Sequence, residues 1–447
     1  MRAVIQAGGK GTRVMELTNN EFPKPMLLID DKPILYHQIM NLKRYGINDI
    51  TIIVSYLKDS IINYFGDGCK FGVNISYVIE DDKHSLGTAG ALYYLKDVID
   101  SDFIFLLGDI FIDIDFDRFI SYHNKYEKDV TLLVHPNNHP FDSDLIVLDG
   151  NRVLDINYKN SVREYYNNVV NAGVMIFSKN CLDLIPDLNK YNYEKDIIKP
   201  LIDKGQVIAY KSSEYVKDMG TVSRYKQVIG DYNNGIVSER NLSKLQKCIF
   251  LDRDGTINKY VGFLTDIDDF CLLDGVSSAI KKINESGYLC IVITNQPVVA
   301  RGDVSFLELD MIHRKMETIL GNDNAYIDDL FYCPHHPDKG FVGEVKELKI
   351  DCNCRKPKTG LIEEAVSKYN IDLGSSFFIG DSSTDMECAR RAGITSVLIR
   401  CGHDDNKYDV KADYEFEDLE DAVNSLVGDR NVYKGNRKLL QKRDRNY

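Results

Sequence analysis

The chain has 447 residues, more than one hydrophobic core usually organises, so we expect two or three domains. Hydrophobic residues make up 44% and charged residues 28% of the sequence, values that exclude wholesale disorder and a long coiled coil. The formal net charge is −13, which repels nucleic-acid backbones and anionic bilayers. We therefore expect small-molecule substrates, and any phosphate must be held by local cations, backbone amides or a divalent metal.

The start of the chain and its ten cysteines bear on where the protein works. Residues 1–7 contain no apolar stretch of signal-peptide length, and the apolar run 103–112 is too short for a membrane helix. We therefore expect a cytoplasmic protein with neither a membrane nor a nucleic-acid partner, and the sequence leaves the oligomeric state open. In that reducing compartment a tight cysteine cluster indicates a metal site rather than disulfides.

Two strand-like apolar runs, 3–7 and 248–251, each lead into a loop rich in glycine or aspartate. Helical and strand-like segments alternate after each run, which is typical of an α/β domain with a parallel sheet. We expect a first domain at residues 1–232, a polar linker at 233–246, a second domain at 247–428 and a basic tail at 429–447. A helix is expected at 33–45, and further strands at 50–54, 75–79, 103–107, 130–134, 289–294, 376–379 and 396–399.

Four motifs occur in order in the first domain. A glycine loop, Gly8-Gly9-Lys10-Gly11-Thr12-Arg13, follows the first strand, and Pro23-Lys24-Pro25 fixes a lysine between two prolines. A second glycine loop, Gly87-Thr88-Ala89-Gly90, precedes a helical run, and the strand at 103–107 ends in Gly108-Asp109. Each motif alone is ordinary, and the first loop lacks the P-loop and dinucleotide fingerprints. Together, over residues 1 to 230, they resemble the sugar-1-phosphate nucleotidyltransferases, which have a Rossmann-like, GT-A-like fold.

The resemblance implies a set of roles in the first domain. Arg13 and Lys24 would be catalytic cations on the triphosphate, and Asp109 and Asp218 would hold Mg²⁺. Lys159 would contact the sugar phosphate, although the family's Glu-Lys-Pro is here Tyr158-Lys159-Asn160. Gln6 would take part in base recognition. The other substrate-binding residues implied are Gly8, Gly9, Gly11, Thr12, Glu80, Gly87, Asn171, Gly173, Glu194 and Lys195.

The second domain opens with two carboxylates on one loop, in Asp252-Arg253-Asp254-Gly255-Thr256. One such carboxylate can attack phosphorus while the other handles a proton, and the pair also attracts Mg²⁺. With Thr294-Asn295, Lys356 and Gly380-Asp381, this loop resembles the haloacid dehalogenase phosphatases, a Rossmannoid family. The resemblance implies that Asp252 is the nucleophile and Asp254 the acid and base. Thr294, Asn295, Arg355 and Lys356 would bind the phosphate, and Asp252, Asp254 and Asp381 would hold Mg²⁺.

Two short pairs of soft ligands, Cys333-x-His335 and Cys352-x-Cys354, have the composition of a tetrahedral zinc site. We expect Cys333, His335, Cys352 and Cys354 to hold a structural Zn²⁺ that clips a loop beside Arg355 and Lys356, with His336 as the alternative to His335. The seven other cysteines are expected in the core. These pairs and the Asp-Arg-Asp-Gly-Thr loop narrow the resemblance to the heptose 1,7-bisphosphate phosphatases, from which this chain departs at Ser382, where a lysine is common.

The two resemblances imply a bifunctional enzyme of nucleotide-activated heptose biosynthesis. The phosphatase would remove the C7 phosphate of D-glycero-D-manno-heptose 1,7-bisphosphate, and the transferase would join the 1-phosphate to GTP. The product would be GDP-D-glycero-α-D-manno-heptose, with pyrophosphate released. The alternatives are another sugar 1-phosphate or CTP at the transferase, or a sugar-phosphate sensor with a non-catalytic phosphatase domain. The sensor is disfavoured because the expected phosphatase residues are all present.

Overall fold

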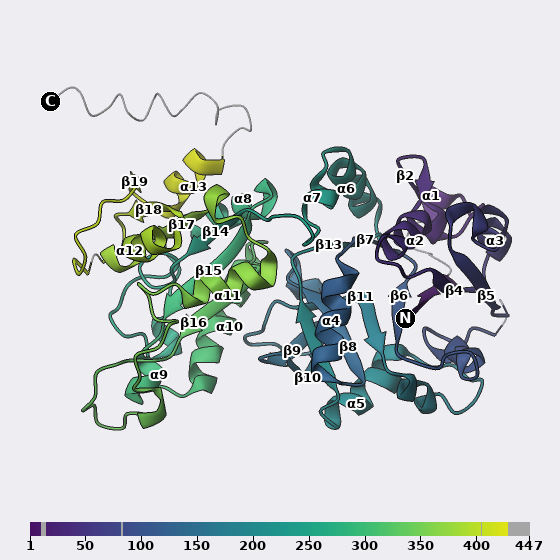
Figure 1. Ribbon diagram of the computed structural model, residues 1–447, viewed down its shortest axis with the longest axis horizontal. Helices are drawn as coiled ribbons and strands as arrows, with labels where there is room; N and C mark the ends of the chain where they lie inside the picture. The colour runs from purple at the N-terminus through teal and green to yellow at the C-terminus, as the bar shows by residue number, and fades with distance from the viewer. Residues whose placement is uncertain (10–14, 82–83, 404, 428–447) are drawn as a thin grey trace. The chain divides into compact units, whose positions relative to one another are not determined.

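A computed structural model of the chain describes residues 1–9, 15–81, 84–403 and 405–427 (Figure 1). Gly11, Thr12, Arg13 and the predicted tail at 429–447 therefore lie outside the described residues. Contacts divide the chain into two compact units, each of the α/β class. The first unit comprises residues 1–135, 142–163 and 169–244, and the second comprises 136–141, 164–168 and the chain from residue 245 onward.

The first unit is built on a nine-stranded sheet with the strand order β5-β4-β1-β6-β11-β8-β12-β10-β9. The first four of these strands are parallel, whereas β11 runs antiparallel to both β6 and β8. Two small antiparallel pairs, β13-β7 and β2-β3, stand beside the sheet. The strands are β1 (Arg2–Gln6), β2 (Leu28–Ile29), β3 (Lys32–Pro33), β4 (Asp49–Val54), β5 (Asn74–Ile79), β6 (Phe103–Leu107), β7 (Ile110–Asp113), β8 (Val130–His135), β9 (Leu145–Asp149), β10 (Arg152–Asn157), β11 (Val170–Phe177), β12 (Val207–Lys211) and β13 (Tyr215–Asp218).

Alternation along the strands gives this sheet an apolar core on each face. Ala3 and Ile5 of β1 face one core, which α2, α3 and α4 cover, while Val4 belongs to the other, which η4, η7 and α5 cover. The helices are α1 (Met15–Thr18), η2 (Lys24–Met26), α2 (Ile34–Arg44), α3 (Lys58–Phe65), η3 (Cys69–Phe71), η4 (Gly90–Leu95), α4 (Phe116–Tyr126), η5 (Pro140–Asp142), η6 (Lys179–Leu184), η7 (Tyr193–Ile198), α5 (Lys199–Asp203), α6 (Val222–Asn233) and α7 (Ile236–Glu239).

The segment that the sequence assigns to the linker, 233–246, is partly structured. It contains α7, whose Val237 is 4% exposed and packs in a small core with Met219 and Val228. The turn-forming residues at 233–235 indicated a linker, but the apolar spacing that follows them folds back onto the first unit. The four domain boundaries themselves stay a prediction.

The second unit contains a six-stranded parallel sheet with the order β16-β15-β14-β17-β18-β19. Helices α8, α10 and α13 cover one face, while α11 packs on β16 and α12 on β17 and β18. The elements are β14 (Cys248–Leu251), η8 (Ile267–Asp269), α8 (Val276–Ser286), β15 (Leu289–Asn295), α9 (Val298–Arg301), α10 (Phe306–Asn322), β16 (Asp329–Cys333), η9 (Lys346–Leu348), α11 (Gly360–Tyr369), η10 (Leu373–Ser375), β17 (Phe377–Gly380), α12 (Ser383–Ala392), β18 (Thr395–Ile399), β19 (Tyr414–Phe416) and α13 (Leu419–Val427).

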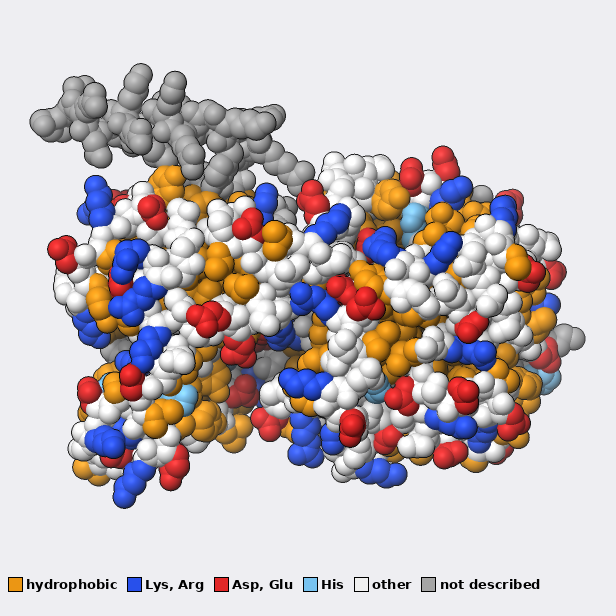
Figure 2. All heavy atoms as spheres, in the orientation of Figure 1, with side chains coloured by type: hydrophobic (Ala, Val, Ile, Leu, Met, Phe, Trp, Pro, Cys, Tyr) orange, Lys and Arg blue, Asp and Glu red, His pale blue; other side chains and the backbone are white. Residues whose placement is uncertain are grey.

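The surface carries acidic and basic side chains side by side. On the face in Figure 2, red and blue side chains alternate over both units without one sign gathering into a large patch. No helix within the described ranges is long and apolar enough to cross a membrane.

Candidate active sites

The first site to consider lies at the carboxyl edge of the second unit's sheet. Asp252 follows β14 directly, Asn295 ends β15, and Asp381 follows β17. Because β14 is hydrogen-bonded to both β15 and β17 in parallel, these three strand ends meet at one edge. The topology thus brings together residues that are up to 129 positions apart, as the sequence pattern predicts.

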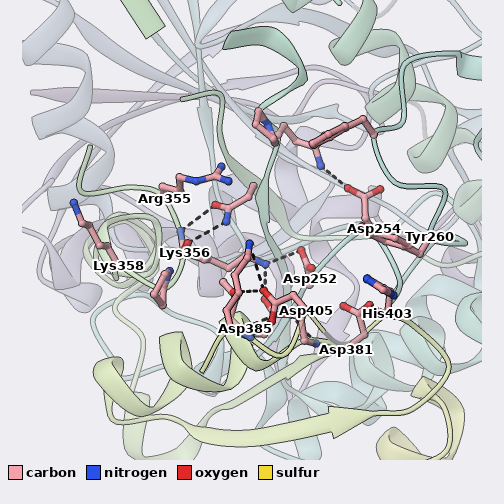
Figure 3. Close-up of a pocket in the computed structure, with 18 of the residues that line it drawn as sticks. Asp252, Asp254, Tyr260, Arg355, Lys356, Lys358, Asp381, Asp385, His403 and Asp405 are labelled. Atoms are coloured by element: carbon pink, nitrogen blue, oxygen red, sulfur yellow. Dashed lines mark hydrogen bonds and ion pairs between the residues drawn. The ribbon is translucent and has the colours of Figure 1, made fainter. Parts of the chain in front are cut away.

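Lys356 joins two aspartates at this edge (Figure 3). Its Nζ lies 2.7 Å from Asp252 Oδ1 and 2.6 Å from Asp385 Oδ1. Burial opposes the charge of Lys356, but the two carboxylates outweigh burial and raise its pKa. Asn295 fixes the backbone of Lys356, since its Oδ1 accepts from Lys356 N at 2.9 Å and its Nδ2 donates to Lys356 O at 3.2 Å. The lysine is therefore a held cation facing the predicted nucleophile.

Three carboxylates, Asp252, Asp381 and Asp385, place ligand oxygens within 4.8 Å of one another. Burial, followed by repulsion between these acids, raises the pKa of Asp252 to about 7 and that of Asp381 to about 8. Clustered carboxylate oxygens are the donors that Mg²⁺ prefers, so the residues fit a divalent hard cation. Asp385 takes the place in this cluster that the sequence pattern assigned to Asp254.

Asp254 belongs to a separate network. Its carboxylate lies apart from the other labelled aspartates in Figure 3 and accepts from Arg253 Nη2 at 2.9 Å, Gln296 Nε2 at 2.7 Å and Asn258 Nδ2 at 3.0 Å. Thr294, predicted to bind phosphate, is 1% exposed, and its Oγ1 accepts from Gln296 Nε2 at 3.0 Å. Thr294 is thus part of the support beneath Gln296, and its predicted phosphate contact stays a prediction.

Asp381 is enclosed by two glycines. A Cβ at Gly255, whose φ is +83°, would stand 2.0 Å from Asp381 Oδ2, and a Cβ at Gly402 would stand 2.1 Å from it. The backbone N–H of His403 donates to the same oxygen at 2.6 Å. Two backbones can approach this carboxylate so closely only because neither residue carries a side chain.

A cavity of about 430 Å³ opens over these residues, and Asp252, Asp254, Asp381 and Asp385 all line it. Its other charged lining has two further acids, Asp351 and Asp405, and five basic residues, Arg355, Lys356, Lys358, Arg391 and Lys407. Acids that can hold a cation lie beside basic residues that can hold phosphate, so the cavity suits a substrate with more than one phosphate group.

The four predicted zinc ligands do form one cluster. Cys354 Sγ lies 3.1 Å from Cys352 Sγ and 3.3 Å from Cys333 Sγ, and His335 Nδ1 lies 3.2 Å from Cys354 Sγ. All ten cysteines are free, so none of these contacts is a disulfide. Three sulfurs and one imidazole nitrogen converging in this way fit a tetrahedral Zn²⁺. Arg355 Nη1 donates to His335 O at 3.2 Å, which ties the cluster to the cavity.

His336 and the seven other cysteines are not part of the zinc cluster. His336 is outside it, and its Nδ1 accepts from Asp338 N at 3.2 Å. The expectation that the remaining cysteines are core thiols is wrong for three of them, because Cys69, Cys271 and Cys401 are exposed. The buried ones are Cys181, Cys248, Cys290 and Cys388.

The first unit holds a second lysine between two aspartates. Lys24 Nζ lies 2.8 Å from Asp109 Oδ2 and 3.4 Å from Asp218 Oδ1. Asp109 follows β6 and directly precedes Ile110, the first residue of β7. The antiparallel pairing of β13 with β7 places Asp218 opposite Ile110. The predicted metal aspartates and the predicted catalytic lysine therefore meet, as the sequence motifs indicate.

Two cations favour the charged form of Asp218 in this second site. Burial alone would raise the pKa of Asp218, but Lys24 and Arg224 together lower it below its usual value. Arg224 Nη1 donates to Asp218 Oδ2 at 2.5 Å from the first turn of α6. Two half-exposed carboxylates beside two cations fit a divalent metal carrying phosphate groups.

The residues that the resemblance implies for base recognition lie together at the ends of β1 and β5. Gln6 Nε2 lies 3.4 Å from both Glu80 Oε2 and Gly87 O. Gly8 closes against this pair, since a Cβ there would stand 2.7 Å from Glu80 Oε2. Gly87 packs on Tyr191, where a Cβ would meet the carbonyl oxygen at 2.3 Å. Gly9 is open, with no atom near the position of a Cβ.

The residues predicted to bind the sugar are less closely gathered. Asn171 Oδ1 accepts from Gly173 N at 3.0 Å on β11. Burial, with Asp144 nearby, raises the pKa of Glu194. Lys195 is exposed, and Lys159 Nζ instead pairs with Asp142 Oδ1 at 3.5 Å. Within the described ranges neither lysine contacts the Lys24 cluster, so their roles stay predictions.

Comparison with known proteins decides the family. Residues 2–235, more than half of the chain, match the family described as Nucleotidyl transferase. The chain belongs to the nucleotidyl transferase family. Residues 353–422 of this nucleotidyl transferase match a second family, described as HAD-hydrolase-like.

Relatives of the second unit are phosphatases. The chain is 39% identical over 159 residues, 35% of its length and 85% of the relative's, to D-glycero-beta-D-manno-heptose-1,7-bisphosphate 7-phosphatase of Haemophilus ducreyi. It is 43% identical over 158 residues, 35% of its length and 84% of the relative's, to the alpha-anomer phosphatase of Photorhabdus laumondii. The second unit of this nucleotidyl transferase therefore belongs to the same family as these phosphatases.

A solved structure is similar to the first unit. HddC from Yersinia pseudotuberculosis, complexed with GMP-PN, is 26% identical and aligns over 52% of this chain and 99% of its own, with a TM-score of 0.45.

Asn258, Gln296 and Asp385 lie within the motifs of the second domain, where Asp385 is expected beside the metal or bound to it through water, whereas Arg224 lies in no motif. For Asp385 a signal existed. Ser382-x-x-Asp385 is a capping box at the start of α12, and its Ser382 Oγ donates to Asp385 Oδ2 at 2.6 Å. That box fixes the aspartate in the first turn of α12, whose N-terminus faces the cavity. Arg224 of the nucleotidyl transferase unit carries no comparable sequence signal.

Proposed function

We propose that this chain catalyses two successive steps in making a nucleotide-activated heptose. The second unit removes the C7 phosphate of D-glycero-D-manno-heptose 1,7-bisphosphate. The first unit then transfers a guanylyl group from GTP to the heptose 1-phosphate that remains, and pyrophosphate leaves. The observation that carries this proposal is the pairing of the units: a nucleotidyl transferase is joined to a unit 43% identical to a heptose-1,7-bisphosphate 7-phosphatase. The product of one reaction is the acceptor of the other.

The phosphatase step follows from the positions of two aspartates. Asp252 Oδ attacks phosphorus while Asp254 gives a proton to the departing C7 oxygen of the sugar, and Asp254 then takes a proton from the attacking water. Lys356, 2.7 Å from Asp252, stabilises the ionised nucleophile and the phosphoryl oxygens. Mg²⁺ held by Asp252, Asp381 and Asp385 would neutralise charge on the transferring group.

The transferase step needs a different arrangement. The sugar phosphate attacks the α-phosphorus of the nucleotide, so charge develops on the oxygens between acceptor and leaving pyrophosphate. Lys24 lies 2.8 Å from Asp109 and is placed to balance that charge, with Arg13 proposed for the same task. Asp109 and Asp218 would hold a Mg²⁺ ion, which would supply positive charge to the phosphate groups.

Acceptor groups on the base pocket favour guanine. Gln6 Oε1 and Glu80 Oε1 are buried and have no hydrogen-bond partner within the residues that the structure describes. Guanine offers neighbouring N–H donors on its Watson–Crick edge, whereas cytosine and adenine offer an acceptor beside their amino group. A carboxylate acceptor therefore matches guanine. Glu80→Gln should lower kcat/KM for GTP at least tenfold and leave phosphate release unchanged.

The remaining expectations stand as parts of the proposal. Mg²⁺ serves both active sites, and Zn²⁺ is structural in the second unit. The protein works in the cytoplasm on small molecules, without nucleic-acid or membrane partners. Residues 1–232 form the transferase domain and 247–428 the phosphatase domain.

Incubation of the purified chain with heptose 1,7-bisphosphate, GTP and Mg²⁺ tests the proposal. We expect inorganic phosphate, pyrophosphate and GDP-heptose in equal amounts, measured by mass spectrometry and phosphate assays. Omission of GTP should leave heptose 1-phosphate. Parallel reactions with ATP, CTP and UTP, and with the α and β anomers, define the substrates. Transfer with CTP in preference to GTP, or release of phosphate from C1, would contradict the proposal.

A further inference from the structure

Arg253, between the two aspartates of the phosphatase loop, is the largest fully buried side chain in the described residues, with 0% exposure. A buried guanidinium is costly unless a carboxylate compensates it. Within the described ranges Arg253 forms an ion pair only with Asp254. Its Nη1 is buried without a hydrogen-bond partner in the same residues, so part of the free-energy cost of burying the guanidinium is not compensated. An apolar side chain would fill this place at lower cost, which indicates that the charge serves another purpose.

The contacts of Arg253 close a ring around Asp254. Nη2 donates to both carboxylate oxygens at 2.9 Å, and also to Gln296 Oε1 at 3.0 Å. Gln296 Nε2 in turn donates to Asp254 Oδ2 at 2.7 Å. The ring leaves Asp254 little freedom to rotate, because each of its three members is held by the other two.

The backbone of Arg253 is fixed as well. Its carbonyl oxygen accepts from Ile257 N at 2.8 Å and from Asn258 N at 3.1 Å. Asn258 Nδ2 returns to Asp254 Oδ1 at 3.0 Å. His313 lies near Arg253, and its burial, together with the charge of Arg253, lowers the pKa of His313 well below its usual value. His313 therefore adds no second positive charge beside the guanidinium.

We propose that Arg253 is a positioning residue that, together with Gln296, holds Asp254 out of the metal cluster and at the cavity wall, where it moves protons. Asp254 and Gln296 line the cavity, whereas Arg253 does not. Without the guanidinium, Asp254 would be free to turn toward the cation that Asp252, Asp381 and Asp385 would bind. The inference rests on the proposed acid and base role of Asp254.

The two chemical steps depend on that role to different degrees. In the first step the bond between Asp252 Oδ and phosphorus forms, the bond from phosphorus to the sugar oxygen breaks, and that oxygen takes the proton of Asp254. In the second step water bonds to phosphorus, the aspartyl bond breaks, and a water proton returns to Asp254. A leaving group such as 4-nitrophenolate needs no proton in the first step, although the second step still does.

The test compares Arg253→Met with Asp254→Asn and the unchanged chain. With heptose 1,7-bisphosphate, Arg253→Met should lower kcat about 100-fold while KM changes less than about threefold. With 4-nitrophenyl phosphate, stopped-flow absorbance should show a burst of about one nitrophenolate per chain, then slow turnover. Arg400→Met is the matched control, because Arg400 is 60% exposed and pairs with Glu415 at the surface. It should behave as the unchanged chain.

The outcomes distinguish the acid and base role of Asp254 from the positioning role of Arg253. If Asp254→Asn shows neither the loss nor the burst, the acid and base role of Asp254 fails. The positioning role of Arg253 is overturned if Asp254→Asn shows the loss of bisphosphate activity and the burst, while Arg253→Met shows neither. It is also overturned if Arg253→Met loses the burst and the bisphosphate activity equally. Should Arg253→Met not fold, as judged by thermal melting, Gln296→Met removes the second arm of the ring without burying or freeing a charge. Gln296→Met should lower kcat for the bisphosphate roughly tenfold relative to the unchanged chain and should show the burst with 4-nitrophenyl phosphate. Activity equal to that of the unchanged chain on both substrates would overturn the proposal.

Discussion

Each unit places a buried lysine between two aspartates, yet the two trios sit in different surroundings. Lys24 has a side-chain exposure of 5% and its partners Asp109 and Asp218 have 40% and 39%. Lys356 has 3%, while its partners Asp252 and Asp385 have 13% and 1%. The same three charges are therefore half solvated in the transferase and almost dry in the phosphatase.

This difference decides the protonation of the acids. In the transferase, the nearby cations win over partial burial and lower the pKa of Asp218. In the phosphatase, burial and a third carboxylate raise the pKa of Asp252 to about 7 and of Asp381 to about 8. The lowered pKa of Asp218 favours its charged form before a metal arrives, whereas Asp252 and Asp381 must release protons to bind one. Three substitutions and one binding measurement test this contrast.

Asp252→Asn should have the largest effect. An amide cannot form the covalent bond to phosphorus, so phosphate release should fall at least about 1,000-fold. Transfer to supplied heptose 1-phosphate should stay within about twofold of the unchanged chain, because the first unit has its own lysine and aspartates, Lys24, Asp109 and Asp218. Malachite-green and pyrophosphate assays on the same preparation measure both. A folded variant that loses both activities would show that the sites are coupled.

Asp109→Ala is the corresponding change in the first unit. Removal of one of two carboxylates that hold the cation should lower transferase turnover about 100- to 1,000-fold, while phosphate release is unaffected. Asp149→Ala, an exposed aspartate of the same unit, is the control. Full pyrophosphate release by Asp109→Ala in excess Mg²⁺ would remove Asp109 from the site.

Cys352→Ser should have an intermediate effect that is confined to the second unit. Elemental analysis should find about one zinc per unchanged chain and much less in the variant. Loss of zinc loosens the contact from Arg355 to His335, so KM for the bisphosphate should rise about tenfold and transfer should persist. The exposed Cys271, changed to serine, is the matched control. Zinc-free protein with full activity would leave the four residues as packing.

Proton release on Mg²⁺ binding is the smallest and most direct test of the contrast. In an Asp109→Ala background, binding to the phosphatase site at pH 7 should release about one proton, falling toward zero at pH 9. Calorimetry in two buffers of different ionisation enthalpy measures this. Without metal, the raised pKa values of Asp252 and Asp381 contribute stability at low pH that is lost as the pH rises through about 7 to 8. Release that does not vary with pH would contradict the shifts.

The sequence predicted the parallel parts of the fold better than the antiparallel ones. Unbroken apolar runs at 103–107 and 248–251 coincide with β6 and β14, because strands buried on both faces need apolar residues throughout. The antiparallel pair β9-β10 of the first sheet was not predicted. Its strands are mixed with polar residues on exposed positions, as in Arg152–Asn157, and carry a weaker signal.

The site residues could likewise be predicted only in part. Motifs identified the trio of Lys24, Asp109 and Asp218, in which Lys24 begins η2, Asp109 follows β6 and Asp218 ends β13. They placed Asp254 with the metal ligands, whereas its carboxylate turns to Arg253, because proximity to Asp252 in the chain does not fix where a carboxylate turns. That direction is set by Arg253, a charged residue that composition alone places at the surface. The buried ion pair is therefore visible only in three dimensions.

The two glycines beside Asp381 set a limit on how the phosphatase can diverge. A methyl group at residue 255 or 402 would overlap the carboxylate, so even alanine must displace a metal-binding oxygen or a loop. Residues on the cavity rim, such as Lys358 and Lys407, face no such constraint. Lineages descended from this enzyme can therefore exchange the rim to accept new sugars while the floor stays fixed, and a saturation library should recover variants at 358 and 407 but almost only glycine at 255 and 402.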